Sequence, residues 1–337
     1  MSKKPRPLVS IIVCHHTGDL LYDMLTSLGT ITVPFEVIVV SSNPEICTEG
    51  IDGCKTYFCE GLPAEKRNMG ARMALGVYLA IFDDDVEILP NCIEEMINLI
   101  QIKPNIGMVY GKLKKFDEPH RFDEAGGFLT PTGFIWSRAG QNIIDTGQYD
   151  KPERIFAGKS AACLVKKYVW DKLDGMDEDF GILGEESDLS WRMWLSGFEV
   201  WWCPTSVTLH KFNTPLKPAQ KYYTSSRVHY NGCRNYTTML IKNLGKEHLW
   251  IVPLHLLVWF TASLAMIGTL KIKQGLNIQR AIYSVVRDLP KILKKRKHIQ
   301  EKRTVDESVI WSVIARTPRW SYYFGRFSKY VRIGLHG

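Results

Sequence analysis

Three consecutive aspartates, Asp83, Asp84 and Asp85, follow an apolar run and are the first candidates for chemistry in this chain. Like charges at this spacing repel one another unless something compensates them. A divalent cation such as Mg²⁺ or Mn²⁺ would do so, because hard cations take carboxylate oxygens as ligands, often together with the phosphates of a substrate. If the strand continues through the triplet, Asp83 and Asp85 point to one side and Asp84 to the other. The alternative is an acidic turn at a strand end that is exposed to solvent.

A second group of acids opens a predicted helix in the segment GILGEESDLSWRMWLSGFEVWWCP, residues 181–204. Glu185, Glu186 and Asp188 fall in its first turn, where the helix dipole favours negative charge. Asp188 and Arg192 have the i, i+4 spacing of an ordinary surface ion pair. Tryptophans and a methionine nevertheless make much of this helix apolar. That composition favours a cleft in which one carboxylate acts as a general base.

The elements that would position these acids alternate between strands and helices. Short β-branched runs predict strands at residues 9–13, 35–42, 55–60 and 77–85, and the segments 18–29 and 63–76 predict helices between them. Near-continuous apolar strands separated by helices imply an α/β fold with a parallel sheet covered on both faces. Ligands of such sheets bind beyond the carboxyl ends of the strands, which is where the aspartate triplet lies. No GxGxxG follows the first strand, so a Rossmann dinucleotide site is not expected.

Composition and charge narrow the class of protein. The 337 residues are 45% hydrophobic and 23% charged, which is typical of globular proteins. The eight cysteines are scattered without a CxxC pair, so we expect reduced, mostly buried thiols rather than a zinc site or a disulfide framework. The apolar run near the N-terminus has only about six residues, which is too short for a signal peptide. The net charge of +8 divides into +12 over residues 271–337 and −4 over the rest, which predicts different partners for the two parts.

Taken together, these motifs resemble the inverting glycosyltransferases of family 2, and most closely their rhamnosyltransferase-like branch. The resemblance rests on FDDD after an apolar strand, on AEKRNMGARMALG before it, and on AGKSAACLVKKYVW, GILGEESDLSW and LHKF after it. It covers roughly residues 8–245. It implies a GT-A fold, that is, a Rossmann-like, mostly parallel sheet flanked by helices, and a catalytic domain over residues 1–245.

The resemblance also implies a metal site. Asp83 and Asp85 match the DxD motif, in which Asp85 would be the direct ligand of Mg²⁺ or Mn²⁺ and Asp83 would face ribose or sugar as well as the metal. His210 matches a histidine that lies near the metal and the diphosphate after the last core strand. Asp84 joins the residues expected to bind the nucleotide sugar.

Other residues are expected to contact the nucleotide sugar. Lys66 and Arg67 match a basic pair before a small-residue helix, and Arg67 would reach the base or a phosphate; without the resemblance, Arg67 reads as a solvated helix residue. Ser41 stands where relatives commonly have an aspartate that contacts the base, which leaves the base open among uridine, thymidine and guanosine. His15 and His16 could contact the nucleotide or serve the structure.

The predicted catalytic group comes from the second acidic motif. Glu186 takes the place of the catalytic aspartate of the family, with Glu185 before it and Asp188 at the second acidic position. Glu186, or else Asp188, would remove the proton from an acceptor hydroxyl as it attacks the anomeric carbon opposite the leaving diphosphate. A single displacement of this kind inverts the anomeric centre.

The region 246–337 is predicted to associate with a membrane. Residues 249–270 are apolar except for Pro253 and His255, which is long enough to cross a hydrocarbon core of about 30 Å. A single span would carry the basic segments that follow away from the cytosol, against the positive-inside tendency. We therefore expect a re-entrant or interfacial helix, with the basic, aromatic tail at 318–334 on anionic lipid. A buried core helix is the alternative.

The resemblance and these patterns together predict an enzyme at the cytosolic face of the cell membrane, peripheral or monotopic. It would move a hexosyl or deoxyhexosyl group from a nucleoside-diphosphate sugar to a hydroxyl of a lipid-linked or cell-surface glycan. Direct transfer onto polyprenyl phosphate is the alternative within enzymes. A nucleic-acid-binding protein is disfavoured because the basic residues lie beside the apolar segment, and a non-catalytic sugar-binding scaffold because the acidic set is intact.

Overall fold

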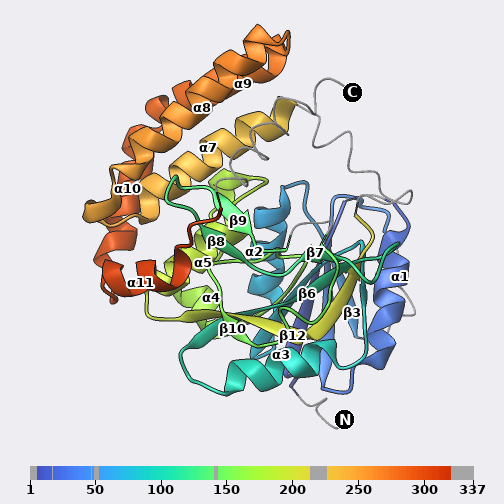
Figure 1. The fold of residues 1–337 in the computed structure, drawn as a ribbon. Helices are drawn as coiled ribbons and strands as arrows, with labels where there is room; N and C mark the ends of the chain where they lie inside the picture. The colour runs from blue at the N-terminus through green and yellow to red at the C-terminus, as the bar shows by residue number, and fades with distance from the viewer. Residues whose placement is uncertain are drawn as a thin grey trace. The chain divides into compact units, whose positions relative to one another are not determined.

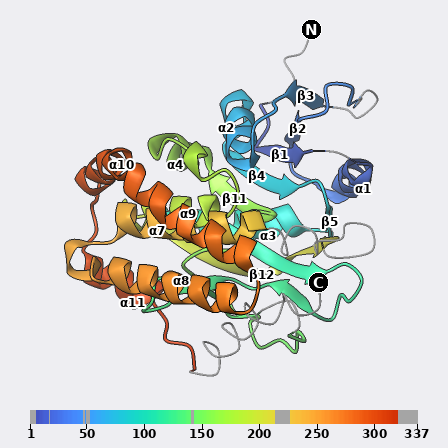
Figure 2. The same ribbon diagram turned by 90° about the horizontal axis from the view of Figure 1, so that it is seen from above.

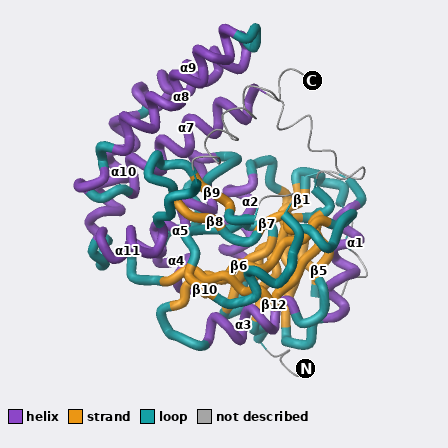
Figure 3. The backbone as a smooth tube through the Cα atoms, in the orientation of Figure 1, coloured by secondary structure: helices purple, strands orange, loops and turns teal. Residues whose placement is uncertain are grey.

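The structure is a computed structural model of the chain, and it describes residues 6–16, 18–46, 48, 53–139, 143–212 and 226–319 (Figures 1 and 3). The chain divides into two compact units. The first comprises Met1–Gly127 and Ser137–Lys217, and the second comprises Phe128–Trp136 and Pro218–Gly337. The predicted tail at 318–334 lies outside the described residues beyond 319.

The first unit is built on a large sheet, to which the described residues contribute ten strands in the order β10-β12-β6-β11-β4-β1-β2-β3, with β5 on β12 and β7 on β6. The bounds are β1 Val9–His15, β2 Phe35–Ser41, β3 Cys54–Phe58, β4 Tyr78–Asp83, β5 Val86–Ile88, β6 Ile106–Lys115, β7 Phe122–Glu124, β10 Glu153–Arg154, β11 Ala162–Lys166 and β12 Glu199–His210. The four predicted strands are confirmed as β1 to β4, and all four run parallel.

The sheet is mixed rather than mostly parallel. β11 lies between β4 and β6 and runs antiparallel to both, whereas β12 is parallel to β6. β11 is buried along its whole length. A strand buried on both faces has the same apolar pattern in either direction, so its sequence could not indicate its orientation.

Helices cover both faces of this sheet. Their bounds are α1 Leu20–Ser27, α2 Pro63–Met73, α3 Cys92–Gln101, α4 Lys167–Lys172 and α5 Glu185–Leu195, with the short 3₁₀ turns η1 Leu28–Thr30 and η2 Glu178–Phe180. The apolar sides of α1 and α3 share one core with alternate residues of β1. α2 lies against the other face, where Ile12 points. A Cβ at Gly70 would come within 2.5 Å of the Ile12 side chain, so glycine permits α2 to lie this close.

The second unit is helical. Its elements are α7 Ser226–Asn243, η3 Lys246–His248, α8 Ile251–Gly268, α9 Ile272–Arg287, α10 Leu289–Glu301 and α11 Glu307–Ile314, with the short strands β8 Gly127–Leu129 and β9 Ile135–Ser137 at its junctions with the first unit. α7 packs against α8, α9 and α10, and α8 and α9 lie side by side (Figure 2). Cys233, Trp259 and Ile278 form part of the core between them. The predicted boundary at residue 245, between a catalytic domain and a membrane-associated region, is defined by function rather than by packing and stays a prediction.

The predicted apolar helix is confirmed as a helix. η3 and α8 together, Lys246–Gly268, form a 23-residue stretch that is long and apolar enough to cross a membrane, by length and composition alone. The cysteines among the described residues are free thiols, and Cys92, Cys163, Cys203 and Cys233 are buried. Cys47 lies outside the described residues.

Candidate metal and nucleotide-sugar site

Asp83, Asp85 and His210 form a cluster of possible metal ligands. One ligand atom from each lies within 4.8 Å of the others. Asp83 ends β4, and the chain then turns at Asp84 and Asp85 instead of continuing as a strand. β5 pairs with β12 so that Val86 lies opposite His210, and this pairing brings Asp85 beside the imidazole, with 3.5 Å between Asp85 Oδ1 and His210 Nε2.

The donor set suits a hard divalent cation. Two carboxylates and one imidazole are ligands that Mn²⁺ accepts, and Mg²⁺ prefers oxygen ligands with several positions left for phosphate and water. Asp83, Asp85 and His210 would hold the ion, which agrees with the predicted cofactor. Asp84 points away from Asp83 and Asp85, as predicted, but the reason given for this was wrong. The strand does not continue through the triplet, and a turn directs Asp84 elsewhere.

Asp84 contacts the end of β1 instead of the cluster. Its carboxylate lies 2.8 Å from His15 Nδ1 and accepts from the backbone N–H of His16 at 3.4 Å. His15 and Asp84 are both buried. These contacts join the β4 turn to β1, so His15 has at least a structural role.

The basic pair on α2 is buried rather than solvated. The Arg67 side chain is only 5% exposed; one guanidinium nitrogen donates to Asp83 Oδ1 at 2.9 Å and the other to Glu185 Oε1 at 3.0 Å. Burial alone would lower the pKa of Arg67, but Asp83 and Glu185 outweigh it and raise that pKa above its ordinary value. Lys66 donates to the His15 carbonyl at 2.6 Å. Arg67 therefore links the two acidic motifs that the sequence analysis singled out.

The acids of α5 differ in their surroundings. Asp188 is fully buried and accepts from Arg192 Nε at 2.8 Å, and Arg192 also donates to the carbonyls of Leu173 and Gly175. The alternative of a surface ion pair is therefore wrong for Asp188 and Arg192. Glu185 is buried in its contact with Arg67, whereas Glu186 is partly exposed.

Glu186 has the properties of a proton acceptor. Removal from water, together with the neighbouring Glu185 carboxylate, raises the pKa of Glu186 above its ordinary value. A carboxylate with a raised pKa is a stronger base once it is ionised, and partial exposure leaves it open to an incoming hydroxyl. Asp188 lacks this exposure.

Ser41 ends β2 directly opposite His15 in the register of the sheet. It is fully buried, and its hydroxyl accepts from the backbone N–H of Asn43 at 2.9 Å. Ser41 thus lies at the predicted edge of the sheet, where its side chain holds the turn that follows β2.

Two residues of this site were missed by the sequence analysis. Asp123 Oδ2 on β7 lies 2.8 Å from His210 Nδ1 and 2.6 Å from Lys159 Nζ. Burial alone would raise the pKa of Asp123, but Lys159 and His210 outweigh it and hold that pKa well below its usual range. Burial likewise opposes the charged imidazole, yet Asp123 and Asp85 raise the pKa of His210 to about 9. A three-residue strand has no periodic signal, and nothing in its sequence indicated this contact.

Comparisons with known proteins agree with this geometry. Residues 10–168, just under half of the chain, match the family described as Glycosyl transferase family 2. The chain is 29% identical over 213 residues to the O-antigen biosynthesis protein RfbC of Myxococcus xanthus, which covers 58% of this chain and 16% of that protein. The chain thus spans about a sixth of the length of this curated relative.

Solved structures share the fold at low sequence identity. GalNAc-T7 with UDP, GalNAc and Mn²⁺ superposes with a TM-score of 0.58 at 16% identity, covering 85% of this chain and 58% of that one. The mannosyltransferase PcManGT from Pyrobaculum calidifontis, in complex with GDP-Man and Mn²⁺, gives 0.52 at 14% identity, covering 98% and 87%. The chain therefore has the GT-A fold, with a match to glycosyl transferase family 2 over residues 10–168 and a carboxylate–histidine cluster that could hold a divalent metal ion.

Proposed function

We propose that this protein is a metal-dependent inverting glycosyltransferase. It moves a hexosyl or deoxyhexosyl group, as in the rhamnosyltransferase-like branch, from a nucleoside-diphosphate sugar to a hydroxyl of a lipid-linked or cell-surface glycan. The observation that carries the proposal is the contact network from the Asp83, Asp85 and His210 cluster through Arg67 to Glu185, the neighbour of the proposed base Glu186. It supports a single site for the diphosphate and the attacking hydroxyl.

The chain's own residues account for the main steps of the reaction. Glu186 accepts the proton of the attacking hydroxyl. Arg67, already paired with Asp83, adds positive charge behind the site where the diphosphate leaves. A divalent cation held by Asp83, Asp85 and His210 would supply Lewis-acid stabilisation of that leaving group.

The proposed acceptor and location draw on two further observations. The relative from Myxococcus xanthus carries the name O-antigen biosynthesis protein, which suits a cell-envelope glycan. Only 28% of an 18-residue apolar stretch of this helix is buried, which suits contact with lipid better than a core helix. We place the protein at the cytosolic face of the cell membrane, as a peripheral or monotopic protein.

The test is a screen of nucleotide sugars with the full-length protein in detergent, with Mn²⁺, with Mg²⁺ and with EDTA. We expect release of a nucleoside diphosphate from one donor, dependent on the metal, and an inverted anomeric configuration in the glycosylated product by NMR. Asp85→Asn should abolish release, because a hard anionic ligand is lost. Asp171→Asn, a change at an exposed acid paired with Lys167, is the matched control and should retain activity.

The outcomes separate the alternatives. Full release by wild-type protein in EDTA, or by Asp85→Asn, would contradict the metal assignment. Transfer to polyprenyl phosphate without any hydroxyl acceptor would favour the alternative acceptor, for which Glu186 is less necessary because the acceptor is already anionic. Retention of the anomeric configuration would contradict the single displacement.

A further inference from the structure

We propose that Asp123 is a positioning residue for the metal site: it holds His210 so that the imidazole Nε2 would face a bound cation, while Lys159 pairs with the Asp123 carboxylate. The proposal rests on the metal site of the proposed function but not on sugar transfer itself. No motif in the sequence pointed to Asp123 or Lys159, and the assignment comes from their contacts.

The geometry distinguishes the two nitrogens of His210. Nδ1 lies 2.8 Å from Asp123 Oδ2, whereas Nε2 lies toward Asp85 at 3.5 Å from Oδ1. An ionised carboxylate only accepts hydrogen bonds, so the proton on this side of the ring belongs to Nδ1. With a cation bound, Nε2 would give up its own proton and offer its lone pair to the ion on the side of Asp85. A second carboxylate behind a metal-binding histidine sets its tautomer, fixes the ring orientation and increases its basicity.

Asp123 is itself held from two directions. Lys159 Nζ donates to the same Oδ2 atom at 2.6 Å, and the Asp123 side chain is only 3% exposed. A carboxylate buried this deeply needs charged partners, since desolvation is otherwise strongly unfavourable. Lys159 supplies one while its own side chain remains 30% exposed. The carboxylate therefore stays ionised without depending on His210 for its charge balance.

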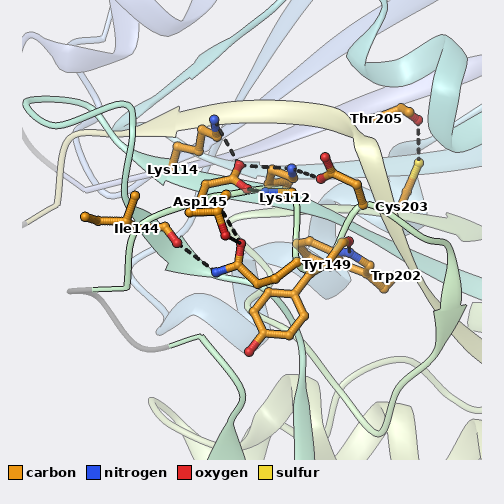
Figure 4. Close-up of polar contacts among 12 residues, drawn as sticks. Lys112, Lys114, Ile144, Asp145, Tyr149, Trp202, Cys203 and Thr205 are labelled. Carbon is orange, nitrogen blue, oxygen red and sulfur yellow. Dashed lines mark hydrogen bonds and ion pairs between the residues drawn. The ribbon is translucent and has the colours of Figure 1, made fainter.

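The backbone around Asp123 is also constrained. β7 pairs with β6, and Phe122 N donates to the Ile143 carbonyl at 2.9 Å on its other side. The segment that follows Ile143 is held to β6 by Asp145, whose carboxylate lies 3.0 Å from both Lys112 and Lys114 (Figure 4). Asp123 thus projects from a short strand fixed along both edges, which is what a positioning residue requires.

Asp145 provides a matched control for the alternative that Asp123 only stabilises the fold. Like Asp123 it is paired with cationic side chains, its side chain is only 7% exposed, and it helps hold the same stretch of chain. It contacts Lys112, Lys114 and local backbone rather than His210. If Asp123 only stabilises the fold, Asp123→Asn and Asp145→Asn should behave alike. If it positions His210, the two variants should differ in metal affinity.

The experiment measures Mn²⁺ binding to metal-free, full-length protein by the EPR signal of free Mn²⁺, without any sugar nucleotide. We expect Asp123→Asn to weaken binding about 10- to 100-fold, the usual effect of losing such a partner, and Asp145→Asn to change it by less than about twofold. In a His210→Ala background, Asp123→Asn should have little further effect, because Asp123 acts through the imidazole.

Several results would overturn the proposal: equal effects of the two Asn variants, an undiminished effect of Asp123→Asn without His210, or no Mn²⁺ binding by the wild type. A wild-type protein that binds Mn²⁺ through this pair but transfers no sugar would contradict the proposed function alone. If Asp123→Asn does not fold, ¹⁵N NMR of histidine-labelled wild-type protein loaded with diamagnetic Zn²⁺ replaces it. The His210 signals should show the Nδ1–H tautomer, and an Nε2–H tautomer would contradict the assignment.

Discussion

Glu186 couples the proposed chemistry to stability. Its pKa is raised in the folded protein by removal from water and by Glu185, so the folded state holds this proton more tightly than the unfolded chain does. Stability contributed by the protonated form is therefore present at low pH and falls as pH rises above the ordinary carboxyl range of about 4 to 5. The ionised form of Glu186, which a general base requires, is therefore the form that the folded state stabilises less.

We therefore predict that Glu186→Gln stabilises the protein increasingly as pH rises from 5 to 8, while lowering turnover by roughly 10²-fold or more. Urea unfolding of the variant and the wild type at both pH values measures the first effect, and donor turnover measures the second. Stabilisation that is equal at both pH values would show that the carboxyl has an ordinary pKa. If Asp188→Asn loses turnover while Glu186→Gln does not, the two acids exchange roles.

Arg67 shows a different consequence of buried charge. Its removal leaves the carboxylates of Asp83 and Glu185 facing each other without a counter-charge. Breaking a buried ion pair by removing one partner costs about 3 to 5 kcal/mol, so we predict a loss of roughly that size for Arg67→Met in urea unfolding. Arg72→Met, on the same helix but at an exposed position, is the control and should change the free energy of unfolding by less than about 0.5 kcal/mol.

The cluster of possible metal ligands could be predicted from sequence where its residues lie in a short motif. Asp83 and Asp85 are two residues apart, so a local pattern was enough to bring them together. His210 joined them through the family resemblance. Asp123 and Lys159 were missed because they lie far from His210 in the sequence, Asp123 on a three-residue strand and Lys159 in a loop, and an isolated Asp or Lys is usually solvated.

At the scale of elements, the segment between α4 and η2 joins the two helices that carry the proposed site. On α2, Asn68 accepts from the backbone N–H of Met176 at 2.9 Å and donates to its carbonyl at 2.8 Å. On α5, Arg192 donates to the carbonyls of Leu173 and Gly175. Both helices thus bind one short stretch of backbone, which maintains their separation.

We predict that Asn68→Asp destabilises the protein by about 1 to 3 kcal/mol, the usual cost of leaving a buried group unsatisfied. The new carboxylate still accepts from the Met176 N–H. Its second oxygen, however, faces two other acceptors, the Met176 carbonyl and Glu178 Oε1; in the wild type, Asn68 donates to Glu178 Oε1 at 2.9 Å. The midpoint of urea unfolding measures the effect. A wild-type midpoint would mean that the backbone near Met176 is held by other contacts.

Elements were predictable where periodicity was strong. β1 to β4 follow from short β-branched apolar runs, and the helices α1, α2 and α5 follow from segments that begin or end at glycines. Read without the family resemblance, Arg67 was expected to be solvated, and this reading is wrong because the carboxylates of Asp83 and Glu185 pair with it in the interior. Direction and neighbours in the sheet, as for β11, depend on distant pairing and were not readable from local sequence.

At the scale of the whole chain, charge separates the C-terminal region from the rest. Residues 271–337 have a net charge of +12, against −4 for residues 1–270. Within the second unit, α8 exposes Leu257, Phe260 and Leu264, each by 45 to 56%, at spacings that place them on one side of the helix. On α9, Ile272 and Tyr283 are exposed as well. Apolar and cationic groups on exposed helices are the two attractions that an anionic membrane surface offers.

Removing the C-terminal helices would be a poor test of the proposed membrane attachment. α7 packs against α8 and α9, and the ring of Phe134 contacts those of His255 and Trp259 in tilted arrangements, so a chain ending near Lys246 would lose part of its own core. Substitutions at exposed positions leave that core intact. We therefore choose the triple variant Leu257→Gln, Phe260→Gln and Leu264→Gln.

We predict that the full-length protein floats with anionic vesicles at low salt, remains largely bound in 1 M salt, and leaves with detergent. Salt screens the cationic contribution, about 1 kcal/mol for each nearby Lys or Arg, but not the burial of apolar surface at roughly 25 cal/mol per Å². The triple variant should bind at low salt through charge alone and dissociate in 1 M salt. Binding of the variant in high salt would contradict an interfacial α8. Topology is tested separately, because cleavage after residue 271 by a protease added outside sealed cells would mean that the helix spans the membrane.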